Sequence, residues 1–220
     1  MDLSRERLQK NITAPIRIND SIFSGRVSFN GTILDEQFDL SGSNFAKEVY
    51  FQGAGFSSYA YFIGADFNDN SSFGGTSFRD YASFVGASFR KNAKFNFAGF
   101  SGVANFREAH FSGSADFVEA NFNGKADFRW ADFKGWADFG WTDFACLTGF
   151  MPFADFMSAN FGSYVNFGFA SFSGDANFLN TDFNDDANFD DTDFNGDASF
   201  DDADFNRDGI FNFATFKKRA

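Results

Sequence analysis

The chain has 220 residues, a formal net charge of −12 and 39 Phe residues. The acidic charge disfavours direct contact with nucleic acid or an anionic membrane, and a single Cys excludes an intrachain disulfide framework. The first residues lack a basic segment followed by an apolar run, and no stretch reaches the roughly 18–20 apolar residues of a membrane span, so we expect a cytoplasmic protein.

Residues 1–17 come before the regular part of the sequence. They are expected to form an N-terminal cap region, in which Ser4 would N-cap a short helix carrying Leu3 and Leu8. Such a cap would cover the first open edge of the structure that follows.

Residues 18–216 repeat with a period of eleven. From Phe45 to Phe216, Phe occupies 32 successive positions at spacings that alternate between five and six residues, apart from one step near residue 150. A repeat of this kind is the signature of a solenoid. We therefore expect one continuous domain over residues 18–216.

Each repeat unit predicts a short strand followed by a corner. The residue two positions before each Phe is small, and in an extended segment it points to the same side as the ring, while the Asp, Asn or Ser between them points away. The residues that follow are turn formers such as Gly, Asn and Asp. The rings are expected to form a stacked core with no catalytic role. This core ladder includes Phe45, Phe51, Phe56, Phe62, Phe106, Phe111, Phe117, Phe122, Phe183 and Phe194.

The unit Ala-Asp-Phe or Ala-Asn-Phe followed by two variable positions, as in Ala115-Asp116-Phe117, resembles the pentapeptide-repeat family. The resemblance covers almost the whole chain and implies an all-β, right-handed quadrilateral β-helix with four faces in each coil. Every second unit carries a sixth residue, so a four-faced coil needs 22 residues, whereas a flat two-faced coil would need 11. Bulky and polar residues alternate at the third position of the six-residue units, as at Tyr59 and Asn70, which favours about nine coils of 22 residues.

The spacing changes once, between residues 145 and 156. Two six-residue steps follow each other there, from Phe144 to Phe150 to Phe156. This predicts a register break in which the longer unit swaps position, with a bulge or slight kink and no loop insertion. Aromatic residues at nearby outward positions are expected either to cover neighbouring coils or to contact a partner. They include Trp130, Trp136 and Trp141.

The repeats continue to Phe216 and leave a basic tail at residues 217–220. No cap is predicted at this end, and an uncovered solenoid end exposes strand edges and a Phe-lined cross-section. Members of the resembled family often pair through their C-terminal coils, which implies a homodimer with Phe211, Phe213 and Phe216 at the junction. The same end would also permit end-to-end assembly into a structural filament.

Residues 173–208 hold twelve Asp and one Arg. This segment is expected to be either a solvated surface or an acidic binding patch. The candidate patch consists of Asp185, Asp186, Asp190, Asp191, Asp201 and Asp202. Some members of the resembled family mimic duplex DNA and bind DNA gyrase, which implies a quinolone-resistance type of binder as an alternative. In this chain, however, the acidic residues are concentrated in the last coils, whereas a duplex mimic should carry them along most of the rod.

Asp204, Asn206 and Asp208 match the first half of a calcium loop, but Thr215 stands where the loop's twelfth residue, Glu, is expected. We therefore predict no dedicated metal site and only this weak candidate.

The sequence predicts no catalytic site. His110 is the only histidine and lies at an outward position, and Cys146 has no partnered base. No phosphate-binding loop, cofactor motif or metal-ligand set is present in the sequence. We expect a bacterial, non-enzymatic scaffold for protein–protein interaction that dimerises through its C-terminal coils and binds itself and another protein, with no nucleic acid, membrane or small-molecule substrate.

Overall fold

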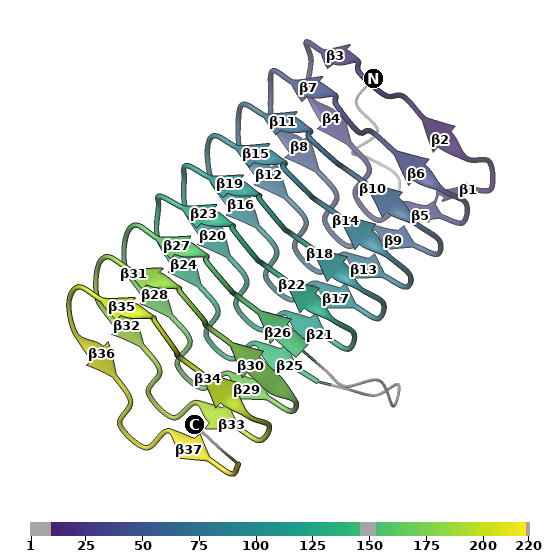
Figure 1. Cartoon of the computed structure of the whole chain (residues 1–220). Coiled ribbons are helices and arrows are strands. Elements are labelled where there is room, and N and C mark those ends of the chain that lie inside the picture. Colours follow the sequence, from purple (N-terminus) through teal and green to yellow (C-terminus); the bar gives the residue numbers. More distant parts are fainter. Residues whose placement is uncertain (1–9, 146–152, 219–220) are drawn as a thin grey trace.

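The chain forms a rod in which four parallel β-sheets run along the long axis. A computed structural model describes residues 10–145 and 153–218, and in these ranges the regular structure consists of strands of two or three residues. Successive strands follow the four sheets in turn, so that each coil contributes one strand to each sheet. Figure 1 shows β1–β4 at one end of the rod and β34–β37 at the other. None of the described residues form a helix that could cross a membrane.

The sheets are named A to D in the order in which the chain first reaches them. Sheet A consists of β1 (Asn11–Ile12), β5 (Ile33–Leu34), β9 (Gly55–Phe56), β13 (Ser77–Phe78), β17 (Gly99–Phe100), β21 (Asn121–Phe122), β25 (Asp143–Phe144), β29 (Ser171–Phe172), β33 (Asp193–Phe194) and β37 (Thr215–Phe216). Sheet B consists of β2 (Ile16–Arg17), β6 (Phe38–Asp39), β10 (Ala60–Tyr61), β14 (Ala82–Ser83), β18 (Ala104–Asn105), β22 (Ala126–Asp127), β26 (Phe153–Asp155), β30 (Asp175–Asn177) and β34 (Ala198–Ser199).

Sheets C and D lie opposite A and B in each coil. Sheet C consists of β3 (Ile22–Phe23), β7 (Asn44–Phe45), β11 (Asp66–Phe67), β15 (Ser88–Phe89), β19 (His110–Phe111), β23 (Asp132–Phe133), β27 (Asn160–Phe161), β31 (Asp182–Phe183) and β35 (Asp204–Phe205). Sheet D consists of β4 (Val27–Ser28), β8 (Val49–Tyr50), β12 (Ser71–Ser72), β16 (Ala93–Lys94), β20 (Ala115–Asp116), β24 (Ala137–Asp138), β28 (Val165–Asn166), β32 (Ala187–Asn188) and β36 (Gly209–Ile210).

The strand register confirms the four-faced coil of 22 residues. Phe45 pairs with Phe67, and Phe67 pairs with Phe89, in parallel ladders. The flat coil of 11 residues is therefore wrong. Sheet A, with ten strands, spans nine coils, as the repeat predicted.

Stacked Phe rings fill the interior, as expected. Rings one coil apart are nearly parallel, as for Phe67 and Phe89 with centroids 4.8 Å apart and an interplanar angle of 1°. Rings in adjacent columns meet edge to face, as for Phe84 and Phe95 at 5.3 Å and 86°. Both arrangements suit the quadrupole of an aromatic ring. The ten ladder residues named from the sequence are buried, and the small residues beside them leave room for the rings.

The regular coil begins earlier than the repeat suggested. β1 and β2 lie within residues 1–17, the expected cap region, and pair with β5 and β6. The residues at this start are Ile12 and Ile16, which pack partly buried against the core and replace the Phe that marked the repeat. The predicted helix at Ser4 lies outside the described residues.

The break near residue 150 is an insertion. Ala126 pairs with Ala154 and Phe133 with Phe161, so partners are 28 residues apart across this region instead of 22. Phe144 stacks over Phe122 and Phe156 stacks over Phe128, so they take successive ladder positions. The predictions that the longer unit swaps position and that no insertion is present are wrong. Phe150 itself lies outside the described residues.

Candidate functional site

The corner that joins sheet D to sheet A has an unusual backbone. Its turn is closed by a hydrogen bond from the N–H of the fourth residue to the carbonyl of the Phe that begins it, as from Ala54 to Phe51 at 2.9 Å. The third residue has a positive φ, which favours Gly. In the first coils it is Gly31, Gly53 and Gly75.

Later coils place larger residues at the same left-handed position. They are Phe97 (φ 58°), Glu119 (φ 55°), Trp141 (φ 58°), Phe169 (φ 59°), Asp191 (φ 52°) and Phe213 (φ 57°). For an L-residue this conformation costs about 1–2 kcal/mol relative to the right-handed one. We call this series the corner column.

The aromatic members of the corner column gain little burial in return for this cost. The exposed fractions of Phe97, Trp141 and Phe169 are 57%, 61% and 47%. Trp141 and Phe169 stack on each other with centroids 4.3 Å apart and an interplanar angle of 7°. Large exposed rings held in a strained backbone are typical of a binding surface and not of a core.

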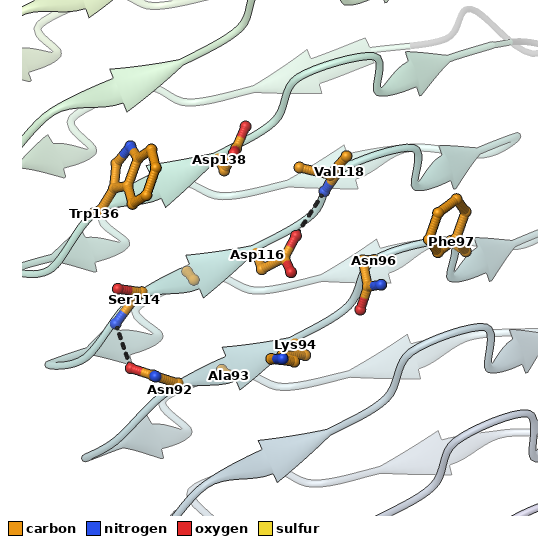
Figure 2. Close-up of a pocket in the computed structure, with 11 residues that line it drawn as sticks. Asn92, Ala93, Lys94, Asn96, Phe97, Ser114, Asp116, Val118, Trp136 and Asp138 are labelled. Atoms are coloured by element: carbon orange, nitrogen blue, oxygen red, sulfur yellow. Dashed lines mark hydrogen bonds between the residues drawn. The ribbon is translucent and has the colours of Figure 1, made fainter.

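A groove of about 360 Å³ lies on sheet D beside this column. Figure 2 shows Trp136 and Phe97 on either side of it, with Asp116 and Lys94 between them. Asp138 also lines the groove, together with the uncharged polar residues Asn92, Asn96 and Ser114. The groove crosses β16, β20 and β24, and it therefore joins residues that are 22 or more positions apart in the sequence.

The floor of the groove carries a column of charges. Lys94 pairs with Asp116, and Asp116 pairs with Asp138, in the parallel register of sheet D. Burial raises the pKa of Asp116, and the Asp138 carboxylate adds to this, whereas the N–H of Val118 and the charge of Lys94 oppose it. Asp138 accepts hydrogen bonds from the N–H of Gly140 at 3.0 Å and from the Asn166 amide at 2.8 Å.

Replacing Asp116 with Asn is expected to stabilise the rod at pH 7 by roughly 0.5–1 kcal/mol. Because its pKa is raised, folded Asp116 holds a proton more readily than the unfolded chain does. Its ionisation therefore lowers stability as pH rises, and this penalty is absent below its unfolded pKa. The Asn oxygen can still accept a hydrogen bond from the N–H of Val118. Asn105 and Asn166 accept the equivalent bonds, from the N–H groups of Arg107 and Gly168.

Denaturant unfolding at pH 7 and about pH 4 tests this expectation. The advantage of Asp116→Asn should shrink at the lower pH. An equal advantage at both pH values would show that the carboxylate charge is not its cause.

A second groove, of about 450 Å³, lies on sheet A on the other side of the corner column. Trp141, Glu119 and Asp143 line it together with Asn121. Burial raises the pKa of Asp143. The corner column is thus a ridge with an aromatic and acidic groove on each side.

Sheet B carries an ionic cluster across the insertion. Asp127 and Asp155, each 4% exposed, lie one coil apart. The Arg129 guanidinium donates to Asp127, with Nε 2.8 Å from Oδ1, and its Nε lies 3.3 Å from Asp155 Oδ2. Lys125 Nζ lies 3.2 Å from Asp127 Oδ2 and 3.8 Å from Asp155 Oδ2. We call Lys125, Asp127, Arg129 and Asp155 the sheet B cluster.

The two carboxyl groups of the sheet B cluster differ. Burial would raise the pKa of Asp127, but the hydrogen bond from Arg129 and the charge of Lys125 outweigh it, so this pKa is lowered. Burial raises the pKa of Asp155, supported by the charge of Asp127. The hydrogen bond to Asp127 in turn raises the pKa of Arg129.

Sequence reasoning missed the sheet B cluster and Phe97. In a 22-residue register Asp127 would face Gly149, and only the 28-residue register brings it beside Asp155. Phe97 had an available signal, because it interrupts a series of Gly residues spaced by eleven from Gly31 to Gly86.

The structure separates the three Trp residues named from the sequence. Trp136 lies where sheet C passes to sheet D, at the edge of the sheet D groove, and its ring centroid is 5.9 Å from that of Tyr164. Trp141 lies on the corner between sheets D and A and lines the sheet A groove. Trp130 lies on the corner between sheets B and C, beneath the guanidinium groups of Arg107 and Arg129.

The candidate acidic residues surround the last coils and do not gather on one face. Asp185 and Asp186 lie where sheet C passes to sheet D, and Asp190 and Asp191 follow β32 of sheet D. Asp201 and Asp202 follow β34 of sheet B, at the opposite corner.

The weak metal candidate is spread over two faces. Asp204 belongs to β35 of sheet C, and Asp208 precedes β36 of sheet D. The Asn206 amide donates to Asn184 Oδ1 at 3.0 Å. Within residues 10–145 and 153–218, no three His, Cys, Asp or Glu residues form a group that could hold a metal ion.

At the C-terminal end, Phe213 is 81% exposed and Phe216 is 39% exposed, while Phe211 is partly buried against the core. His110, on sheet C, has Nδ1 3.8 Å from Asp132 Oδ2 and is exposed. In the part of the chain that the structure describes, His110 and Asp132 are not joined to a nucleophilic side chain.

A parallel β-solenoid with a stacked Phe core and grooved outer faces defines a repeat protein of the solenoid class. Residues 98–140 and 156–204 match a family model described as pentapeptide repeats, in nine copies. The two matched ranges flank the insertion. The repeats in these two ranges are those of the pentapeptide-repeat family, as the Phe ladder predicted. A search of curated proteins found no match.

Proposed function

We propose that this protein is a non-catalytic scaffold that binds other proteins along its faces and forms a homodimer through its C-terminal coils. The observation that carries the proposal is the corner column, where exposed Phe and Trp side chains occupy a left-handed backbone position that Gly holds in the first coils. Exposed aromatic residues are enriched at protein interfaces.

The backbone supports the dimer. Besides the bonds between two strand residues, N–H groups at the start of and just after the strands of sheets B and D donate to the following coil, as from Phe189 to Ile210. The N–H groups at the same places in sheets A and C donate to the preceding coil, as from Asn206 to Phe183. The last described coil therefore directs these flanking N–H groups outward beside sheets B and D, and the corresponding carbonyl groups outward beside sheets A and C. Consider a two-fold axis perpendicular to the rod, along a diagonal of its four-sided cross-section. This axis would place the N–H groups of one protomer opposite the carbonyl groups of its partner, with the paired strands antiparallel.

Replacing Phe213 with Asp is expected to halve the solution mass. Phe213 is 81% exposed at the end of the corner column, so a charge there should oppose pairing without disturbing the core. Light scattering coupled to size exclusion should give about twice 24.5 kDa for the unmodified protein and the single value for the variant.

Phe169→Asp is the matched control, since Phe169 has the same backbone conformation two coils away. It should leave the mass unchanged. A monomer before any substitution would contradict the dimer, and large polydisperse assemblies would favour end-to-end assembly.

A further inference from the structure

Two six-residue segments, eleven positions apart, share most of their sequence and differ in their cations. Residues 125–130 read Lys-Ala-Asp-Phe-Arg-Trp, and residues 136–141 read Trp-Ala-Asp-Phe-Gly-Trp. The first segment includes β22 on sheet B and ends at the corner between sheets B and C. The second includes β24 on sheet D and ends at the corner between sheets D and A. The Asp, the core Phe and the corner Trp are common to both.

In the first segment the chain supplies its own guanidinium group. Arg129 donates to Asp127, and its Cζ lies 5.6 Å from the centre of the Trp130 ring. Arg107, one coil earlier, lies 4.6 Å from the same ring. At this corner the Asp127 carboxylate binds the Arg129 guanidinium group by a charge-assisted hydrogen bond, and the Trp130 indole attracts both guanidinium groups by cation–π interaction.

In the second segment the carboxylate and the corner Trp remain, but the cations are replaced. Gly140 stands where Arg129 is in the first segment, and Trp136 stands where Lys125 is. Among the described residues, no Lys or Arg lies over the ring of Trp136 or Trp141, although several lie over other rings. The groove beside Trp136 has room, at about 360 Å³.

The charges on the groove floor are unbalanced. Lys94 is the cation of the column, and it faces two carboxylates, Asp116 and Asp138. Asp138 is engaged by the Gly140 N–H and the Asn166 amide, while Asp116 accepts the Val118 N–H at 3.1 Å. One further positive charge would balance the column, and it would relieve the repulsion that contributes to the raised pKa of Asp116.

We propose that the sheet D groove binds an arginine side chain of a partner protein, with the guanidinium group against Asp116 and Asp138 and its face on Trp136. This inference rests on the proposed scaffold function and adds the chemistry of its partner. Phe97 closes the opposite side of the groove, where we expect its ring to contact the aliphatic part of the arginine.

Arginine suits this groove better than lysine. Its planar group donates to two acceptors at once and stacks on an aromatic face, and it is less strongly hydrated than an ammonium group. Binding of hexa-arginine and hexa-lysine peptides, which carry equal charge, separates this recognition from general attraction to an acidic protein. Isothermal titration calorimetry in about 150 mM NaCl screens the distant charges. We expect hexa-arginine to bind about tenfold more tightly than hexa-lysine.

Variants locate the site. The pair Asp116→Asn and Asp138→Asn should weaken hexa-arginine binding about tenfold or more, and Trp136→Ala should weaken it about tenfold. Lys94→Gln, which removes the competing cation, should strengthen it about two- to fivefold. The matched control is the pair Asp201→Asn and Asp202→Asn, which removes the same charge at the corner between sheets B and C and should change the affinity less than about twofold.

Equal binding of the two peptides, or equal loss from the two Asn pairs, would overturn the proposal. The mass measurement on Phe213→Asp is independent of this groove, so the two ideas can fail separately. A stable dimer that does not discriminate between the peptides would leave the dimer standing without the arginine site. A monomer that binds hexa-arginine through Asp116 and Trp136 would show the reverse.

Discussion

Replacing Arg129 with Met is expected to lower the free energy of unfolding by about 3 kcal/mol or more at pH 7. Asp127 and Asp155 are each 4% exposed and lie one coil apart. Arg129 contacts both carboxylates, and without it Lys125 alone would face two buried negative charges. Removing one partner from a buried ion pair leaves an uncompensated charge, which costs more than the pair contributes. Met keeps much of the side-chain volume.

The charge explanation has a direct control. In the background Asp127→Asn with Asp155→Asn, the cost of Arg129→Met should fall below about 1 kcal/mol, because no buried carboxylate remains. The fold accepts Asn at these positions, since Asn105 and Asn177 occupy them in the neighbouring coils of sheet B. Guanidinium chloride unfolding followed by circular dichroism measures each difference. An equal cost in both backgrounds would assign the effect to packing of Arg129 on Trp130.

The same substitution should matter less in acid. Asp127 has a lowered pKa, so its favourable pairing is present at neutral pH and is lost as pH falls through its folded pKa. Asp155 has a raised pKa. As the pH falls, its protonation in the folded state therefore removes the cost of holding its buried negative charge. With the carboxyl groups neutral, Arg129 has little charge to compensate.

The period of the sequence predicted the coil because a solenoid repeats its own contacts. A ring such as Phe67 must stack on Phe45 and Phe89, so the spacing of the rings carries the length of the coil. Alternation within each short strand then assigned inward and outward positions, and the buried fractions of Phe and Ala follow that assignment.

The insertion could not be identified in the same way because its extra length equals one repeat unit. The six additional residues place Phe150 at the distance from Phe144 that a ladder position would have. Spacing along the chain does not say which ring stacks on which. Only the pairing of Phe128 with Phe156 reveals that the phase before and after the insertion is the same.

The candidate site could be predicted from the sequence only in part, because its residues come together only when the coils stack. Trp136 and Trp141 stood out as aromatic residues at outward positions, but the groove depends on Lys94, Asp116 and Asp138, which are brought together only across three coils. The left-handed backbone at Phe97 and Phe169 is also a property of the turn and not of the residue. Sequence propensity argues against aromatic residues there, so the strain was not anticipated.

Replacing Phe106 with Ala, in the middle of the rod, is expected to lower the free energy of unfolding by about 3–5 kcal/mol. The Phe106 ring is 0% exposed and stacks on Phe84 at 4.8 Å and on Phe128 at 4.9 Å. It also meets Phe95 and Phe117 edge to face. The backbone of each coil is fixed by ladders on four faces, so the cavity can collapse only slightly. Denaturant unfolding followed by far-ultraviolet circular dichroism measures the loss.

Phe97→Gly removes a ring of the same size and provides the contrast. Phe97 is 57% exposed and lies at φ 58°, so relief of about 1–2 kcal/mol of backbone strain should offset the lost contacts and the entropy of Gly. The net change in stability should stay within about 1 kcal/mol. A cost equal to that of Phe106→Ala would mean that Phe97 packs as core. A near-zero cost together with weaker hexa-arginine binding would mean that this coil gives up backbone stability to present an aromatic surface. The earlier coils, which have Gly31, Gly53 and Gly75 at the same corner, present no such side chain there.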